Sequence, residues 1–258
     1  MNPSRRDFLK LSGAALLSVA STRVRPVLAE AAVSAPVIWR GSLHHRYVAL
    51  TYDDCYLVKK MQELEKLLAD YPEVRVTLFP VGTAISNNET KDHGIWKRFH
   101  DRGHEIGYHS WDHTNLAVMS PASVLTDYDK WLDALTKALG FEPKMRFARP
   151  PFGVLSYSFE SLCERRGLVA TMWSAAGGGE TDIVMKNTFA KIRNGDIVLL
   201  HIRTDDIKTT RETLPYLKEQ KIEAVTMTRM YDDVLRERNQ SDGCEIGSGI
   251  SLTRTCIE

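Results

Sequence analysis

Two histidines and a pair of adjacent carboxylates are the residues of this sequence best suited to chemistry. His109 and His113 are four residues apart in the segment His-Ser-Trp-Asp-His, and Asp53 and Asp54 are neighbours. Two imidazoles at this spacing can meet one metal ion if the segment is helical or turns tightly. Each pair alone also fits a purely structural role: the histidines as polar loop residues, and the carboxylates as helix caps. Together they predict a divalent metal ion held by two histidines and one carboxylate.

A metal ion with three protein ligands has room for a water molecule, which favours a catalytic site over a structural one. The attacking water must lose a proton, and the carboxylate that does not bind the metal can accept it. The residues alone leave open which of Asp53 and Asp54 is the ligand and which is the base. This chemistry predicts hydrolysis of an amide or an ester.

Two further segments carry groups that such a reaction needs. Residues 149–153 read Arg-Pro-Pro-Phe-Gly, and the prolines fix a backbone that can direct an N–H at a developing oxyanion. Arg149 can orient a carboxylate by bidentate hydrogen bonding, although a rigid surface turn also fits. His201 ends a strongly apolar run and can protonate a leaving group if it faces the site. A buried structural histidine is the alternative.

Strand-like and helix-like patterns alternate along the chain. We predict strands at residues 47–52, 74–79, 105–108, 145–148, 169–173, 196–200 and 224–227. We predict helices at residues 58–70, 94–102, 120–140, 157–166, 184–193, 210–220 and 231–238. The third of these helices should begin at Ser120 as its N-cap and end at Gly140.

About seven β/α units without a domain boundary predict a single α/β domain with a parallel sheet covered by helices. A closed barrel and an open doubly wound sheet both satisfy this pattern. The reactive residues follow the carboxyl ends of predicted strands, where parallel folds carry their functional loops. The sequence therefore brings these residues to one face of the fold.

Composition sets the broad class. The chain has 258 residues, with 43% hydrophobic and 26% charged residues and a net charge of +1. These values are typical of a globular domain with a full core. A nucleic-acid-binding domain usually shows a strongly basic balance, so we expect no nucleic-acid partner.

Residues 1–32 have the pattern of a cleavable export segment. Arg5 and Arg6 precede an apolar run at residues 11–20, which is too short for a stable membrane span. The string Arg-Arg-x-Phe-Leu-Lys resembles the twin-arginine export signal. It implies passage through the twin-arginine machinery to the periplasm or exterior of a bacterial cell. An amphipathic N-terminal helix is the alternative.

The remaining chain divides into a predicted catalytic domain at residues 33–238 and a Gly/Ser/Cys tail at residues 239–258. Cys244 and Cys256 lie in the tail, where a disulfide between them and two free thiols are both open. Cys55 and Cys163 are far apart in sequence, so their pairing cannot be judged from spacing. The four cysteines lack the close-set pairs of a zinc cluster.

The motifs together resemble the polysaccharide deacetylase family, which shares the chitooligosaccharide deacetylase homology domain and is also called carbohydrate esterase family 4. The resemblance spans residues 47–231, and the motifs occur in the family's order. They are Thr51-Tyr52-Asp53-Asp54, the segments at 109–113 and 149–153, Trp173, and Leu199-Leu200-His201.

This resemblance implies a deformed (β/α) barrel with about seven parallel strands and a divalent metal ion, zinc or a similar one. It implies Asp54, His109 and His113 as the metal ligands. It also implies Asp53 as general base and His201 as general acid. For the remaining motif residues it implies an oxyanion N–H at Phe152 after Pro151, walls of an acetyl pocket at Trp173 and Leu199, and a catalytic role for Arg149.

The sequence departs from the family pattern at two points. The first motif usually continues with Gly, but Cys55 stands there, as a reactive thiol or as a small apolar filler. The family's fourth motif carries an Asp shortly after the tryptophan, which pairs with the motif-three arginine and tunes the acid histidine. Here no carboxylate follows Trp173 before Glu180, so the acid half of the mechanism is less well supported.

We therefore expect an exported metal-dependent hydrolase that removes acetyl groups from an N-acetylated polysaccharide or a peptidoglycan fragment. One alternative keeps this scaffold but acts on O-acetyl esters or small amides. Another is an inactive glycan-binding domain that retains the metal.

Overall fold

The computed structural model describes residues 35–177 and 192–242, with side chains described as far as residue 240. The predicted export segment, Glu180, Cys244 and Cys256 lie outside these residues, as does nearly all of the helix predicted at 184–193.

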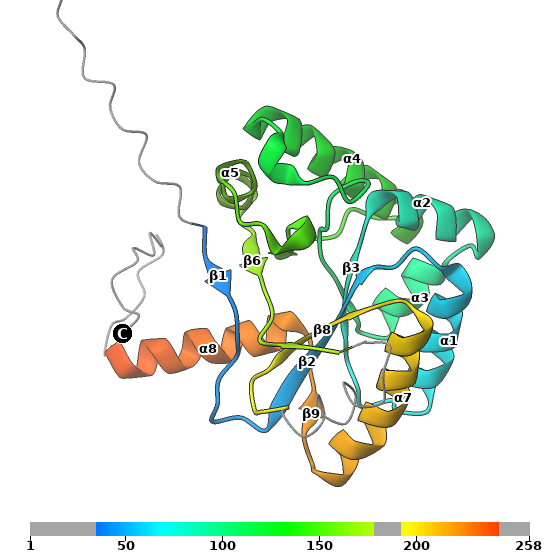
Figure 1. Cartoon of the computed structure of the whole chain (residues 1–258), viewed down its shortest axis with the longest axis vertical. Coiled ribbons are helices and arrows are strands. Elements are labelled where there is room, and N and C mark those ends of the chain that lie inside the picture. Colours follow the sequence, from blue (N-terminus) through cyan, green and yellow to red (C-terminus); the bar gives the residue numbers. More distant parts are fainter. Residues whose placement is uncertain (1–34, 178–191, 243–258) are drawn as a thin grey trace, which may run out of the picture. The chain divides into compact units, whose positions relative to one another are not determined.

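The described strands are all parallel and form two sheets (Figure 1). One has the order β1-β6-β5, and the other has the order β4-β3-β2-β8-β7 with β9 also pairing with β2. A bridge between Tyr108 and Ala148 joins the two sheets. The strand bounds are β1 Val37–Ile38, β2 Tyr47–Asp54, β3 Thr77–Pro80, β4 Glu105–Ile106, β5 Phe147–Ala148, β6 Val169–Thr171, β7 Ala175–Ala176, β8 Ile197–His201 and β9 Glu223–Ala224. The fold is a deformed β/α barrel, which confirms that prediction over an open sheet.

The central strand β2 is buried on both faces. Its residues alternate between two apolar clusters because successive side chains point to opposite sides of a strand. Leu50 and Tyr52 pack in the larger cluster, to which the helices contribute. Ala49 packs in a smaller cluster with Phe79 and Ile197 from the neighbouring strands. Thr51 and Asp53 have the same parity as Ala49, so they continue this inner side of the barrel toward its carboxyl end.

Helices cover the outer side of the strands (Figure 1). The third predicted helix, α4, begins after Ser120, whose side chain accepts from the Ser123 N–H, and ends at Gly140 with φ 82°, as predicted. It packs against α2, α3 and α5. The helix bounds are α1 Val58–Ala69, α2 Gly82–Lys91, α3 Ile95–Asp101, α4 Pro121–Leu139, α5 Tyr157–Arg166, α7 Thr204–Glu219 and α8 Met227–Asp242, with 3-10 turns at Leu116–Val118 and Pro151–Gly153.

The structure differs from the predicted elements at two places near the site. Helix α2 was not predicted, because its middle is a run of polar residues at 86–90 that hides the apolar face. Helix α7 begins at Thr204, six residues before the predicted start. Asp205 and Asp206 in its first turn favour this start, since carboxylates interact well with a helix N-terminus.

No helix within residues 35–177 and 192–242 is long and apolar enough to cross a membrane.

Trp131 is the buried anchor between α4 and the sheet, which leads to a stability prediction. Its indole N–H donates to the Pro80 carbonyl oxygen at 2.8 Å, and its ring meets Tyr108 edge-on at 5.5 Å. Trp131→Ala should lower the free energy of unfolding by about 3–5 kcal/mol in urea titration. Lys137→Ala, on the exposed side of the same helix, should change it by less than about 0.5 kcal/mol. Equal effects would contradict this role.

Candidate active site

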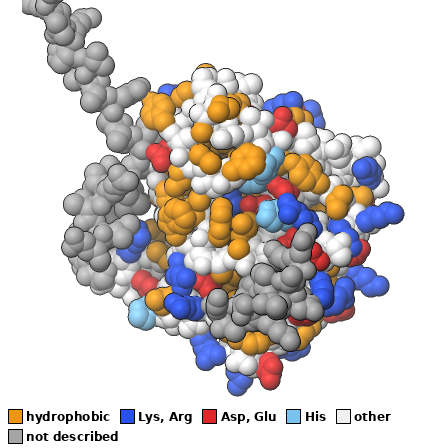
Figure 2. All heavy atoms as spheres, viewed as in Figure 1, with side chains coloured by type: hydrophobic (Ala, Val, Ile, Leu, Met, Phe, Trp, Pro, Cys, Tyr) orange, Lys and Arg blue, Asp and Glu red, His pale blue; other side chains and the backbone are white. Residues whose placement is uncertain are grey.

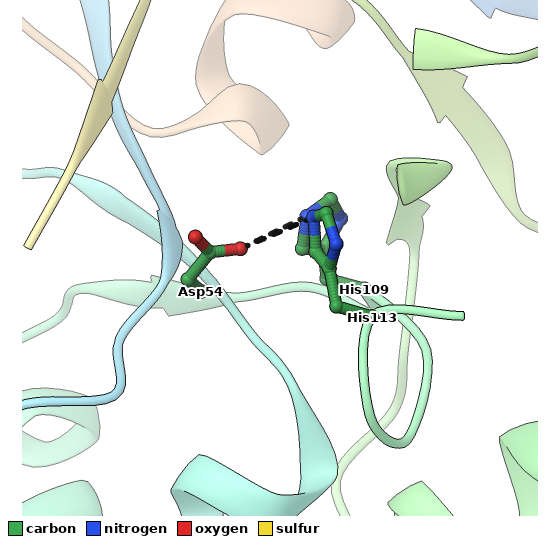
Figure 3. Close-up of side chains that lie close together, drawn as sticks. All are labelled: Asp54, His109 and His113. Atoms are coloured by element: carbon green, nitrogen blue, oxygen red, sulfur yellow. Dashed lines mark ion pairs between the residues drawn. The ribbon is translucent and has the colours of Figure 1, made fainter. Parts of the chain in front are cut away.

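The three predicted metal ligands lie together (Figure 3). Asp54 is the last residue of β2, and His109 and His113 lie on the loop that follows β4. The potential ligand atoms of these residues are all within 4.8 Å of one another. Oδ1 of Asp54 is 3.6 Å from Nε2 of His109 and 3.4 Å from Nε2 of His113. Their side chains therefore converge on one point.

The donor atoms fit a divalent cation. Oδ1 of Asp54 is buried and has no hydrogen-bond partner in the described part of the chain. Nδ1 of His109 is 2.8 Å from the Arg149 carbonyl oxygen, so Nδ1 carries the proton and the Nε2 lone pair faces the cluster. A buried carboxylate oxygen without a hydrogen bond raises the free energy of the folded state. A cation bound at this point offsets that cost. Two imidazoles and a carboxylate are ligands that suit zinc.

The charges of the cluster favour such a cation. Burial raises the pKa of Asp54, but its interactions with the histidines, His109 above all, outweigh burial and leave the pKa lowered. Burial lowers the pKa of His109, yet Asp53 and Asp54 raise it overall. The pKa of His113 is lowered by burial and by His109. The carboxylate of Asp54 therefore stays ionised and keeps a negative charge at the point that the two imidazoles face.

The segment from His109 to His113 is a tight loop and not a helix, which is one of the two conformations that its spacing allowed. Ser110 and His113 have φ of 66° and 67°, and the Ser110 hydroxyl accepts from the His113 N–H at 2.9 Å. Five of the six non-glycine residues with positive φ in the described ranges belong to the site. They are Asp54, Cys55, Ser110, His113 and Phe152. Such strain persists only where surrounding structure imposes it.

Helix α2 imposes part of this strain. The N–H groups of Gly82 and Thr83 donate to the carbonyl oxygens of Ser110 and Trp111 at 3.1 and 2.8 Å. A Cβ at Gly82 would lie 2.2 Å from the Trp111 ring, so glycine is required at this position. Sequence reasoning missed this contact because it missed the helix.

Asp127 of α4 holds the same loop from the other side. Its Oδ1 accepts from the Tyr108 hydroxyl at 2.5 Å and from the Trp111 N–H at 2.9 Å. Nothing in the sequence marks this residue, because it is one carboxylate among several polar positions of a regular helix. Its role appears only when α4 packs beside the loop.

Arg149 is wholly buried and holds Asp53, so the surface-turn alternative is wrong. Nη1 donates to Oδ1 of Asp53 at 2.7 Å and to the Thr51 hydroxyl at 2.8 Å. Nε and Nη2 donate to the carbonyl oxygens of Thr171 and Met172. Oδ2 of Asp53 is 3.7 Å from Nε2 of His109, which places this carboxylate beside the predicted metal ligands.

The remaining motif residues border the same site. Phe152 has φ 60° in the turn after buried Pro151, and its ring lies 4.5 Å from that of His113. Trp173 packs so closely on Gly153 that a Cβ there would lie 2.6 Å from its ring.

Strand β8 brings two more motif residues to the site. In the register of β2 and β8, Asp53 is opposite His201 and Thr51 is opposite Leu199. Paired residues of neighbouring strands share a face, so His201 faces the side of Asp53. Figure 2 shows histidine and acidic side chains together in the middle of one face, bordered by hydrophobic side chains.

Cys55 and Arg203 are additional residues near the ligands. Cys55 is wholly buried, and burial together with Asp54 and Asp53 raises the pKa of its thiol, which favours the small apolar filler over a reactive thiol. Arg203 was not predicted, and its mostly exposed guanidinium lies 3.8 Å from Oδ2 of Asp54.

The contacts of Asp127 predict an effect on metal affinity. Asp127→Asn should weaken zinc binding about 10- to 100-fold, as changes behind metal ligands commonly do, because the loop of His109 and His113 loses its anchor. Competition with a chromogenic chelator measures this. Asp133→Asn, on an exposed part of the same helix, is the matched control. Unchanged affinity in Asp127→Asn would contradict the role.

Comparisons with known proteins identify the family of this chain. The family model described as polysaccharide deacetylase matches residues 40–170. Peptidoglycan-N-acetylglucosamine deacetylase PgdA of Listeria monocytogenes is 30% identical over 212 residues, which cover 79% of this chain but only 42% of that protein. A chitooligosaccharide deacetylase of Bradyrhizobium is 29% identical over 163 residues, 60% of this chain and 70% of that protein.

Solved structures share the fold. The Bc1960 peptidoglycan N-acetylglucosamine deacetylase has a TM-score of 0.66 at 25% identity, covering 76% of this chain and 92% of that chain. A pseudoenzyme of carbohydrate esterase family 4 from Bacillus anthracis has a TM-score of 0.69 at 22% identity, covering 78% and 70%. The family model matches more than half of the chain, and the motifs at the strand ends occur in the family's order. The chain therefore belongs to the polysaccharide deacetylase family.

Proposed function

We propose that this protein is a metal-dependent hydrolase that removes acetyl groups from an N-acetylated glycan. The main observation behind this proposal is the buried Oδ1 of Asp54, which has no hydrogen-bond partner among the described residues. It faces two imidazoles and lies next to a carboxylate held by Arg149. Asp54, His109 and His113 would hold the divalent ion, for which zinc suits the donors. The ion would polarise the acetyl carbonyl and make water more acidic.

Asp53 is the general base of this proposal. The Arg149 guanidinium fixes one carboxylate oxygen, and the other lies beside the metal ligands. The free oxygen can accept the proton of the attacking water. Arg149 acts by holding Asp53 and not by contacting substrate, since it is fully buried.

Two further motif residues, Phe152 and His201, carry the oxyanion and leaving-group functions of this proposal. The turn at Pro151 and Phe152 would direct the Phe152 N–H to the oxyanion. His201, on the face of Asp53, would give its proton to the amine nitrogen as the carbon–nitrogen bond breaks. Trp173 and Leu199 would wall the pocket for the acetyl methyl group.

The names of the relatives support a bacterial cell-wall or chitin-like substrate. Two of them are a peptidoglycan deacetylase and a chitooligosaccharide deacetylase. A substrate outside the cytoplasm fits the twin-arginine pattern in residues 1–32 and a location in the periplasm or outside the cell. Residues 33–238 would form the catalytic domain.

One observation favours the alternative of ester or small-amide substrates. Residues 174–177 are Ser, Ala, Ala and Gly, so the described part of the fourth motif offers no carboxylate for the acid histidine. An ester leaving group needs less protonation than an amine. A high rate of ester hydrolysis together with a low rate of amide hydrolysis would support this alternative.

The first test is acetate release. The zinc-loaded protein should release acetate from N-acetylated chitooligosaccharides or peptidoglycan fragments, and Asp53→Asn should lower the rate at least about 100-fold because the base is lost. Zinc content should remain unchanged in Asp53→Asn, whereas Asp54→Asn should lose both metal and activity. Glycan binding without acetate release from any substrate would identify an inactive binding domain and contradict the proposal.

Metal removal is the second test. Dialysis against a chelator should abolish acetate release, and added zinc should restore it. Zinc should also raise the Tm, because a ligand at 100 times its Kd adds about 2.7 kcal/mol to the free energy of unfolding. Asp54→Asn should show neither recovery nor the Tm shift. Full activity after complete metal removal would rule out the proposed chemistry.

A further inference from the structure

Asp206 is a buried carboxylate that the proposed reaction does not yet use. It lies in the first turn of α7 and is only 2% exposed. Its Oδ1 has no hydrogen-bond partner in the described residues. The neighbouring Asp205 is exposed. A buried carboxylate oxygen without a partner is costly unless a nearby positive charge offsets it.

The position of Asp206 in α7 brings its side chain back toward His201. Arg203 is the N-cap of the helix, and Asp206 is three residues further on, a position from which a carboxylate can reach back to the backbone before the helix. Burial raises the pKa of Asp206, while hydrogen bonds from the backbone of His201 and Arg203 and the charge of the His201 ring oppose this. The carboxylate therefore faces the segment that carries His201.

His201 lies in the field of charged groups from three elements. Asp54 of β2 and His113 of the metal-ligand loop interact with its charge on the side of the metal site. Asp206 does so from α7, and the Arg203 side chain extends to Asp54. Asp206 is thus a carboxylate that acts on His201 and, within the described residues, is not committed to the proposed metal or to Arg149.

We propose that Asp206 is the positioning residue of His201, and that it takes the part of the fourth-motif carboxylate, which the described residues 174–177 do not supply. This inference rests on the proposed deacetylase function. Arg149 needs no second carboxylate, because Asp53, Thr51 and two carbonyl oxygens already accept its hydrogen bonds. Asp206 keeps its charge throughout: the proton passes from His201 to the amine nitrogen while the carbon–nitrogen bond breaks.

Leaving-group dependence separates this role from a structural one. An amine must be protonated to leave, but 4-nitrophenolate leaves without a proton. In the zinc-loaded full chain, Asp206→Asn should lower kcat on an N-acetylated chitooligosaccharide about 10- to 100-fold at unchanged KM. Its rate on 4-nitrophenyl acetate should stay within about twofold. Asp205→Asn, with the same charge change in the same turn, should leave both rates unchanged.

Two further variants complete the test. In a His201→Ala background, Asp206→Asn should cause no further loss, because the residue acts through His201. Asp206→Glu, which keeps the charge, should retain more amide turnover than Asp206→Asn. Zinc content and Tm are measured for every variant.

Several results would overturn the inference. Equal losses on amide and ester, a further loss without His201, or unfolding of both Asp206 variants would assign Asp206 a structural role. If Asp206→Asn turns over the amide as fast as the wild type, the role of Asp206 is rejected, but the proposed function is not. A zinc-loaded wild type that releases no acetate from either substrate would reject the proposed function together with this inference.

Discussion

The buried guanidinium of Arg149 is the interaction on which the site depends. It donates to two side chains of β2 and to the backbone oxygens of Thr171 and Met172 at the end of β6, while its own carbonyl oxygen accepts from His109. One residue thus links the proposed base, a metal ligand and the join between the two sheets. Burying an ion pair is expensive, and removing one partner leaves an uncompensated charge. The pair with Asp53 is therefore better explained by geometry at the site than by stability.

Strain and rigid supports act together around this interaction. The backbone is left-handed at Asp54 and at Ser110 and His113 of the loop that carries the two histidines. Non-glycine residues rarely adopt this conformation. Helix α2 holds that loop by two backbone hydrogen bonds and Asp127 holds it by another. These supports fix the ligand atoms before a metal binds, which lowers the cost of ordering them.

The two halves of the site are supported differently. The ligands and Asp53 lie in a network of short contacts within β2, the ligand loop and Arg149. His201 is placed by strand register. The described residues 174–177 offer it no carboxylate, and its proposed partner is Asp206, buried in the first turn of α7. A neighbouring helix can take over this task because only the charge and the direction of the carboxylate matter to the imidazole. The proposed role of Asp206 would let the chemistry persist although one position of the family pattern is lost.

The amino-acid sequence by itself determined the β/α alternation and the caps of α4, because periodicity and capping are local properties. The proposed ligand set followed from the family resemblance, since the residues alone left open which of Asp53 and Asp54 would bind the metal. The alternation alone left a barrel and an open sheet both possible, and the family resemblance favoured the barrel. The bridge between Tyr108 and Ala148, which joins the two sheets, agrees with the barrel. The sequence also did not indicate helix α2 or the positions of Asp127 and Asp206 beside the site. Their roles follow from contacts between residues far apart in the chain or from burial, and a regular polar helix face carries no sign of what packs against it. Tertiary structure alone could reveal them.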